Sequence, residues 1–414
     1  MDHLKTVKQS LSDQVHNLSQ VEHNQAIIGD AYRRAEELAQ AGEVAMARHL
    51  LYALVDGDPN FTPAHTLLSQ LRRTYEADEE KSYDRIGRAL RDGRLIIFLG
   101  DDIPRMSALP SSGPEPPSAS ETMATLIEDL PDDLRQTHFT NGHGDVIGSL
   151  PQITQYFSLL EGEIDLYDQL HTLYSNEDDV DLTLPNTLHW LLATIPQRLR
   201  TKGYPKSKNR RYVIFTTAFD ELLEDAFDAM GQPYHLFAYR PHRIDEDGVN
   251  QSEHFVHYPA ALPYTTRQMK PIKIEIDKAN AYHGHDQDNH PVIVKLCGQR
   301  ISADEPNSVL LTEDQFLAYN QTRELKNLLP TSLLDLIQRN SMLFFGHSLQ
   351  PWHLRLIWQY LRPPAIRRNI PNWAIHPGLN EVEAKFWAEH NITPIDTEPE
   401  TVVDYLYDWL EALS

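Results

Sequence analysis

The sequence predicts an α/β protein in which an all-helical N-terminal arm precedes a doubly wound parallel sheet. From residue 93 onward, short apolar runs alternate with longer segments of helical periodicity, as expected for parallel strands joined by helices on both faces of a sheet. Before residue 93, apolar residues recur at three- and four-residue spacing and glycine is rare, which is typical of helices. We therefore divide the chain into a helical arm, residues 1–83, and an α/β domain, residues 84–414.

The arm contains one visible helical repeat and part of a second. Its small and large apolar positions, closed by a proline, follow the tetratricopeptide pattern at Ala35, Leu38, Ala47, Leu51 and Pro59. One repeat cannot bury its own apolar face. The arm is therefore expected to pack on the α/β domain or on another chain. A plain helical hairpin that only resembles the repeat is the alternative.

Six buried strands are expected in the α/β domain. They cover residues 95–99, 212–215, 291–296, 341–346, 372–376 and 391–396. Ligands of parallel sheets bind at the carboxyl ends of the strands. The candidate site is therefore formed by the residues at the ends of the first four strands: Gly100, Asp101 and Asp102; Thr216, Thr217, Ala218 and Asp220; Cys297 and Gly298; Gly346, His347 and Ser348.

Charge and composition exclude several classes of partner. The formal net charge is −23, which argues against nucleic acid or an anionic membrane, because both require a basic face. The single cysteine, Cys297, excludes a cysteine-based zinc site, so no zinc is expected. No apolar run approaches 18 residues and the N-terminus has no apolar signal core, so a cytoplasmic protein is expected.

The strand ends resemble those of the sirtuin-like, Rossmann-type domain of prokaryotic immune NAD hydrolases. In such domains the four turns read FLGAG, TTN(Y/F)D, KLHG and GYSLxDW. The corresponding turns here read FLGDD (98–102), TTAFD (216–220), KLCG (295–298) and GHSLQPW (346–352). The resemblance covers residues 84–414 and implies a sirtuin-like doubly wound sheet.

The resemblance also assigns roles to positions at which this sequence departs from the family. Ala218 stands where an asparagine holds the nicotinamide ribose and the attacking water, and Cys297 stands where a histidine acts as general base. Pro351 replaces the aspartate of the fourth turn. Loss of a positioned general acid or base costs on the order of a hundred- to ten-thousand-fold in rate. The resemblance therefore implies a catalytically degenerate site.

Two aspartates in the first turn bear on cofactor binding. Asp101 and Asp102 stand where the family has alanine and glycine, and a carboxylate about 4 Å from a phosphate costs roughly 4 kcal/mol at an effective dielectric near 20. NAD is thus the implied cofactor, weakly bound, at Gly100, Asp101, Asp102, Thr216, Thr217, Asp220, Gly298, Gly346 and Ser348. Alternatively, the two aspartates and Asp220 could hold Mg²⁺.

Two functions follow from the resemblance. The first is a scaffold or regulatory subunit of a bacterial anti-phage defence system, which contacts a protein partner or further copies of itself through the arm and the sirtuin-like domain; a homo-oligomer is expected. The second is an NAD hydrolase that releases nicotinamide and ADP-ribose with displaced or partner-supplied catalytic groups. His347 is then the residue that could replace the missing base. Cys297 could pair with His347 as a nucleophile, or could simply be a buried apolar side chain.

Histidines elsewhere in the chain have two interpretations. His283, His285 and His290 form a tract typical of metal binding, or an exposed polar loop before the third strand. His254 and His257 alternate with apolar residues in an expected strand, and we expect them to face the surface.

Overall fold

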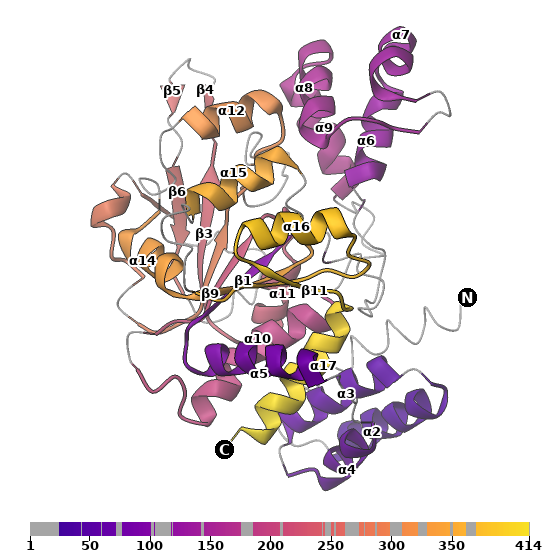
Figure 1. The fold of residues 1–414 in the computed structure, drawn as a ribbon, viewed down its shortest axis with the longest axis vertical. Coiled ribbons are helices and arrows are strands. Elements are labelled where there is room, and N and C mark those ends of the chain that lie inside the picture. Colours follow the sequence, from indigo (N-terminus) through magenta and orange to yellow (C-terminus); the bar gives the residue numbers. More distant parts are fainter. Residues whose placement is uncertain are drawn as a thin grey trace.

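The computed structural model describes residues 25–42, 44–58, 60–71, 77–100, 103, 117, 119–141, 145–174, 185–207, 210–241, 243–244, 250–251, 254–260, 273–276, 278–285, 288–298, 309–321, 329–347, 351–361 and 370–413. Within them, a sheet is flanked by helices on both faces (Figure 1). None of the helices in these ranges combines the length and the apolar composition that crossing a bilayer requires.

Among the described residues the sheet has nine strands, in the order β11-β10-β9-β1-β2-β8-β3-β6-β7. The first seven strands of this order run parallel, and β6 and β7 are added antiparallel at one edge. The strands are β1 (Leu95–Leu99), β2 (Val213–Thr216), β3 (His235–Arg240), β6 (His254–Tyr258), β7 (Ile274–Glu275), β8 (Val292–Lys295), β9 (Ser341–Phe345), β10 (Trp373–Ile375) and β11 (Thr393–Ile395). Two short strands, β4 (Arg243–Ile244) and β5 (Asn250–Gln251), pair separately. All six expected strands are present.

Strand β1 lies at the point where the strand order reverses. Strands β2, β8 and β3 lie on one side of it and β9 to β11 on the other, so the switch point falls between β1 and β9. Side chains of β1 alternate between two cores, Ile97 and Leu99 on one face and Ile96 and Phe98 on the other. This alternation explains why the strand is apolar throughout.

Each face of the sheet has its own helical layer. One is covered by α5 (Ala77–Arg91), α10 (Thr187–Thr201), α11 (Leu222–Ala229) and α17 (Pro399–Ala412). The other is covered by α12 (Glu313–Gln321), α14 (Thr331–Arg339), α15 (Trp352–Leu361) and α16 (Glu381–Glu389). These layers confirm the doubly wound α/β class.

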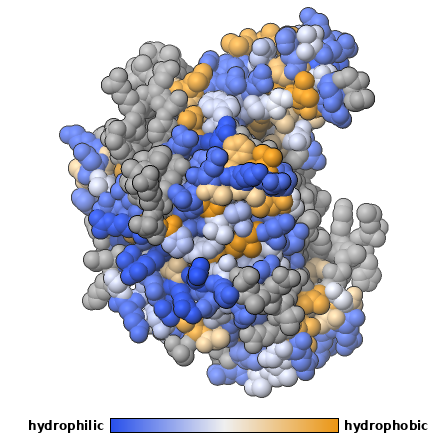
Figure 2. Space-filling model, viewed as in Figure 1, coloured by the Kyte–Doolittle hydropathy of each residue, from blue (hydrophilic) through white to orange (hydrophobic). Residues whose placement is uncertain are grey.

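A small helical lobe projects at the top of Figure 1. It contains α6 (Ala119–Glu128), α7 (Asp132–Leu134), the π-helix η2 (Arg135–Phe139), α8 (Leu150–Leu160) and α9 (Glu163–Tyr174), and it has its own core. Hydrophobic residues gather on parts of this lobe in Figure 2, and also near the middle of the face shown. Leu159 and Ile164, near the α8–α9 turn, are 72% and 70% exposed.

The described part of the arm contains α2 (Gln25–Gln40), α3 (Val44–Gly57) and α4 (Thr62–Gln70), and it packs on α17 through α3. Arg48 of α3 is buried, and its Nε lies 2.9 Å from a carboxylate oxygen of Asp404. Tyr52 stacks on Tyr407 with ring centroids 3.8 Å apart. Of the two packing arrangements expected for the arm, the structure shows the one on the α/β part of the chain. Helix α5 runs without a break through residues 83 and 84, where we placed the domain boundary.

Candidate functional site

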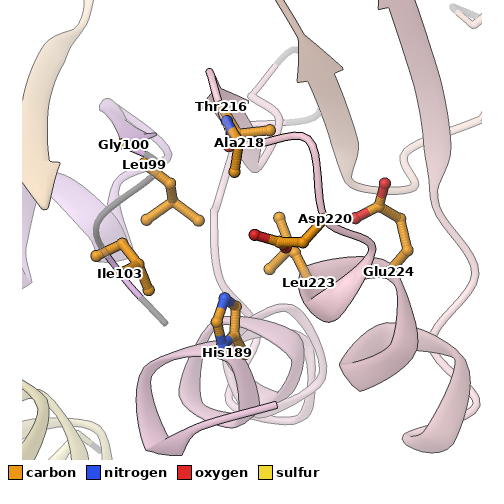
Figure 3. Close-up of a pocket in the computed structure, with 9 residues that line it drawn as sticks. All are labelled: Leu99, Gly100, Ile103, His189, Thr216, Ala218, Asp220, Leu223 and Glu224. Atoms are coloured by element: carbon orange, nitrogen blue, oxygen red, sulfur yellow. Dashed lines mark hydrogen bonds between the residues drawn. The ribbon is translucent and has the colours of Figure 1, made fainter. Parts of the chain in front are cut away.

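A pocket lies at the carboxyl ends of β1 and β2 (Figure 3). Side chains from β1, β2, α10 and α11 converge on it, together with Ile103 just after β1. The lining residues are Leu99, Gly100, Ile103, His189, Thr216, Ala218, Asp220, Leu223 and Glu224. Four of these, Gly100, Thr216, Ala218 and Asp220, are among the residues that the sequence predicts for the site.

Two glycines, Gly100 after β1 and Gly346 after β9, allow the backbones to approach closely beside the pocket. The amide of Gly100 donates a hydrogen bond to the carbonyl of Phe345, at 2.8 Å, and a Cβ on Gly100 would lie 1.8 Å from the carbonyl oxygen of Gly346. Gly346 has a φ of +58°, and a Cβ there would lie 2.8 Å from Ile103. Backbone therefore meets backbone at the switch point, and neither position tolerates a side chain.

The turn after β2 is held by its own hydrogen bonds. The hydroxyl of Thr216 accepts from the amide of Ala218 at 3.0 Å, and the carboxylate of Asp220 accepts from the amide of Leu222 at 3.1 Å, where α11 begins. Thr217 is buried, and its amide donates to the carbonyl of Leu99. Ala218 presents only a methyl group to the pocket, so this position offers no side-chain hydrogen bond.

His189 lines the pocket from α10 and is not among the residues predicted from the sequence. Its Nδ1 accepts from the backbone amide of Asn186 at 3.2 Å, as part of the capping box that starts α10. A ring nitrogen that accepts from an amide carries no proton, so the proton resides on Nε2. Burial lowers the pKa of His189 to about 4, although Asp220 acts in the opposite direction. At neutral pH the ring is therefore uncharged. The available sequence signal was Asn186 three residues before His189, a helix start.

Glu224 and Lys295 form a buried ion pair next to the pocket. The Nζ of Lys295 lies 2.8 Å from the Glu224 carboxylate and also donates to the carbonyl of Asp220. Burial raises the pKa of Glu224 to about 7, against the opposing effect of Lys295. Burial would lower the pKa of Lys295, but the carboxylates of Glu224 and Asp220 outweigh this effect and raise it. Lys295 is thus a fixed cation that ties β8 to the β2–α11 turn.

Cys297 and His347 lie outside the pocket. Cys297 is 2% exposed and packs in the core on the α12–α16 face. His347 packs its ring against Phe98 and Phe344, with centroids 4.8 and 5.8 Å away. Burial, followed by the neighbouring His353, lowers the pKa of His347 to about 3. Neither ring nitrogen of His347 has a hydrogen-bond partner among the described residues. Neither side chain lines the pocket together with Ala218.

The other predicted residues are placed as follows. Gly298 has a φ of +108° and pairs with Val309 in an isolated bridge. Pro351 precedes α15 and is partly buried. Asp101, Asp102 and Ser348 lie outside the described residues. In the part of the chain that the structure describes, no group of three or more His, Cys, Asp or Glu side chains is placed to hold a metal ion.

Comparison with known proteins agrees with this architecture. A family model described as "SIR2-like domain" matches residues 212–395. A search of curated proteins finds no match to the chain. The matched stretch runs from the start of β2 to the end of β11, so β1 and Gly100 lie before it. It includes Ala218, Asp220, Glu224 and Lys295. Residues 212–395 are therefore similar to a SIR2-like domain, and they share their sheet with β1.

Proposed function

We propose that this protein is a catalytically degenerate SIR2-like protein that acts as a scaffold or regulatory subunit. The observation that carries the proposal is the chemistry of the pocket lining. Its three titratable groups are each engaged in holding local structure: His189 at the start of α10, Asp220 at the start of α11, and Glu224 on Lys295. The remaining lining is mainly aliphatic, with Ala218 at the position that the resemblance assigns to catalysis.

Cleavage of a glycosidic bond in NAD requires a group that orients the ribose and a group that accepts a proton. His189 is poorly suited to accept one at its pocket-facing nitrogen, because that nitrogen already carries the proton of the neutral ring. Glu224 is paired with Lys295, a fixed cation. This pairing favours the ionised carboxylate, but one carboxylate oxygen is already occupied by the Lys295 Nζ. Ala218 can do neither. These groups support ligand recognition rather than turnover.

The biological setting of the proposal rests on the resemblance to prokaryotic immune proteins. We place the protein in the cytoplasm, in an anti-phage defence system, with contacts to a protein partner or to further copies of itself. NAD is proposed only as a weak ligand. The α17 helix already covers part of the arm, as the contacts of Arg48 and Tyr52 show, so a partner would use the remaining surfaces of the arm or the SIR2-like domain.

One observation favours the alternative, an NAD hydrolase. Asp220 and His189 both point into the space between β1, β2 and α10 (Figure 3), which places a carboxylate opposite a ring N–H donor. Such a pair could hold a polar group of a substrate while a partner chain supplies the base.

NAD turnover followed by mass spectrometry, with calorimetry for binding, separates the two functions. We expect the natural sequence to release no nicotinamide, with or without Mg²⁺. The single variant Ala218→Asn and the variant that combines it with Cys297→His, Pro351→Asp, Asp101→Ala and Asp102→Gly test whether binding and turnover return. Release of nicotinamide by the natural sequence would overturn the scaffold proposal. In that event His189→Gln and His347→Phe would show which histidine takes part, since only His189 lines the pocket.

A further inference from the structure

A chain of four hydrogen-bonded side chains lies at the opposite end of the sheet from the pocket. It joins Tyr282, His257, His235 and Asp288. The Nδ1 of His235 lies 2.9 Å from Nε2 of His257, and the Nε2 of His235 lies 2.9 Å from a carboxylate oxygen of Asp288. The Nδ1 of His257 meets the hydroxyl of Tyr282. His235 and His257 are 2% and 0% exposed. The expectation that His257 faces the surface is therefore wrong.

A backbone amide fixes the direction of this chain. The N–H of Ala260 can only donate, and it lies 3.1 Å from Nδ1 of His235, so that nitrogen carries no proton. His235 must then be protonated on Nε2, from which it donates to Asp288. His257 must carry its proton on Nε2 to donate to His235. Its Nδ1 is left to accept from the hydroxyl of Tyr282. Each ring is neutral, and each has one donor and one acceptor in use.

Neither histidine of the closed chain can bind an additional proton without losing a hydrogen bond. At His235 it would have to occupy Nδ1, toward which both the Ala260 amide and the His257 ring already donate. At His257 it would occupy Nδ1 and force the Tyr282 hydroxyl to turn around. The ring of His257 is also stacked on Phe237, at a centroid distance of 4.4 Å, away from water. Protonation and the closed arrangement therefore oppose each other.

The charged and titratable groups around the chain come from several elements. Asp288 and His290 lie in the segment before β8, His285 follows Tyr282, and Arg211 precedes β2. Arg211 donates to the carbonyls of His285 and Asp288, and His285 also bonds to Ser332 of α14. Burial lowers the pKa of His235 and outweighs the opposite effect of Asp288, while Arg211 and His290 also lower it. For His257, burial, His235 and His285 lower the pKa to about 3.

We propose that Tyr282, His257, His235 and Asp288 form an acid-sensitive latch, which holds the β6–β7 edge and the 278–285 segment against β3 and is released when its two histidines are protonated. Strand β6 pairs with β3 on one side and β7 on the other. The chain crosses from β3 to β6 and on to the 278–285 segment, so opening any of its bonds loosens this edge. The 278–285 segment reaches α14 through the helix η3 (Ala279–Ala281), so release would also loosen that contact.

The magnitude follows from linkage. In the open form each histidine titrates with the ordinary pKa of about 6.5. Lowering the pH therefore increases the equilibrium constant for opening of the latch. Between pH 7.5 and pH 5.0 one histidine increases it about 30-fold and two increase it about 900-fold. The closed form is stabilised little by proton binding over this pH range, because its histidines stay neutral.

Hydrogen exchange with mass spectrometry between pH 7.5 and 5.0, corrected for the intrinsic exchange rate, tests the latch on the full-length protein. We expect protection of amides in 254–258 and 278–285 to fall about 900-fold, while helices α2 and α3 of the arm lose much less. His257→Gln should reduce the fall to about 30-fold. His254→Gln is the matched control on the same strand, because His254 is outside the chain, and it should leave the 900-fold fall unchanged.

Two results would overturn the latch. One is an equal loss of protection in the arm and in the β6–β7 edge, which would indicate global rather than local opening. The other is an unchanged pH dependence in His257→Gln. The first comparison is internal to the natural protein, so it decides the question even if the variant does not fold.

Discussion

At the scale of a single residue, the imidazole of His189 serves both the pocket and the helix that carries it. Because Nδ1 accepts from the Asn186 amide, His189→Ala leaves a buried N–H without a partner. Such a group costs about 1–3 kcal/mol, and we expect a loss of that size in the free energy of unfolding, measured with urea. His189→Gln should recover part of it, because glutamine can accept at the same capping position. Equal stability of the alanine and glutamine variants would contradict the assigned capping role.

At Gly100 the neighbouring backbone lies so close that no side chain fits. A Cβ 1.8 Å from the Gly346 carbonyl oxygen cannot be accommodated without moving β1 from β9. We expect Gly100→Ala to destabilise the protein by about 3 kcal/mol or more, seen as a lower melting temperature or as loss of folded protein. Gly29, inside α2, is the matched control because nothing lies within 4 Å of its Cβ position. There, alanine should stabilise the helix by about 0.5–1 kcal/mol.

Sequence reasoning found some residues of the pocket and missed others for a physical reason. Gly100, Ala218 and Asp220 follow apolar runs directly, so their place at strand ends can be read from local order. His189 reaches the pocket from a helix that precedes β2, and Lys295 acts through Glu224, 71 positions away in the sequence. Such contacts depend on how helices pack over the sheet, and no local pattern encodes that packing.

At the scale of the element, the attachment of the arm depends on one buried cation. Arg48 contacts Asp404 and Asp408 of α17, at 2.9 and 3.1 Å, and is itself fully buried. Arg48→Met removes the charge and leaves two carboxylates uncompensated, which costs about 3–5 kcal/mol. Urea unfolding should show this loss, whereas Arg33→Met, which breaks the exposed pair with Asp30, should change stability by less than about 1 kcal/mol. Similar losses in the two variants would mean that the arm is held mainly by its apolar contacts.

The elements were predictable where they are buried on both faces. The six expected strands follow apolar runs, and their ends agree with the structure within a few residues. Strand β3 was missed because its sequence, HLFAYR, mixes polar and apolar residues. Strand β6 was expected, but its His257 was assigned to the surface. Burial of that ring comes from the 278–285 segment, which lies more than 20 residues farther along the chain.

At the scale of the whole molecule, buried and partly buried titratable groups should set the response to acid. Burial lowers the pKa of His189 and His353 to about 4 and that of His257 and His347 to about 3. Their folded-state pKa values lie below the unfolded value of about 6.5, so the unfolded chain binds more protons and stability falls as the pH drops below about 6.5. Each histidine contributes a loss of about 2 kcal/mol between pH 6.5 and 5.0.

Two acids, the buried Glu224 and the partly buried Asp228, act in the opposite direction. Burial raises the pKa of Glu224 and Asp228 to about 7, above their unfolded values, so each adds up to about 2 kcal/mol of stability as the pH falls over the same range. These four histidines against the two acids leave a net loss of about 3–4 kcal/mol at pH 5.0. His235, whose pKa is also lowered by burial, adds to this loss. Urea unfolding at pH 6.5 and pH 5.0 measures this difference directly. His347→Phe, which keeps the aromatic packing on Phe98 and Phe344, should remove about 2 kcal/mol of the loss. Stability that is equal or higher at pH 5.0 would show that the two acids dominate and that the buried histidines are charged or water-exposed in the folded protein.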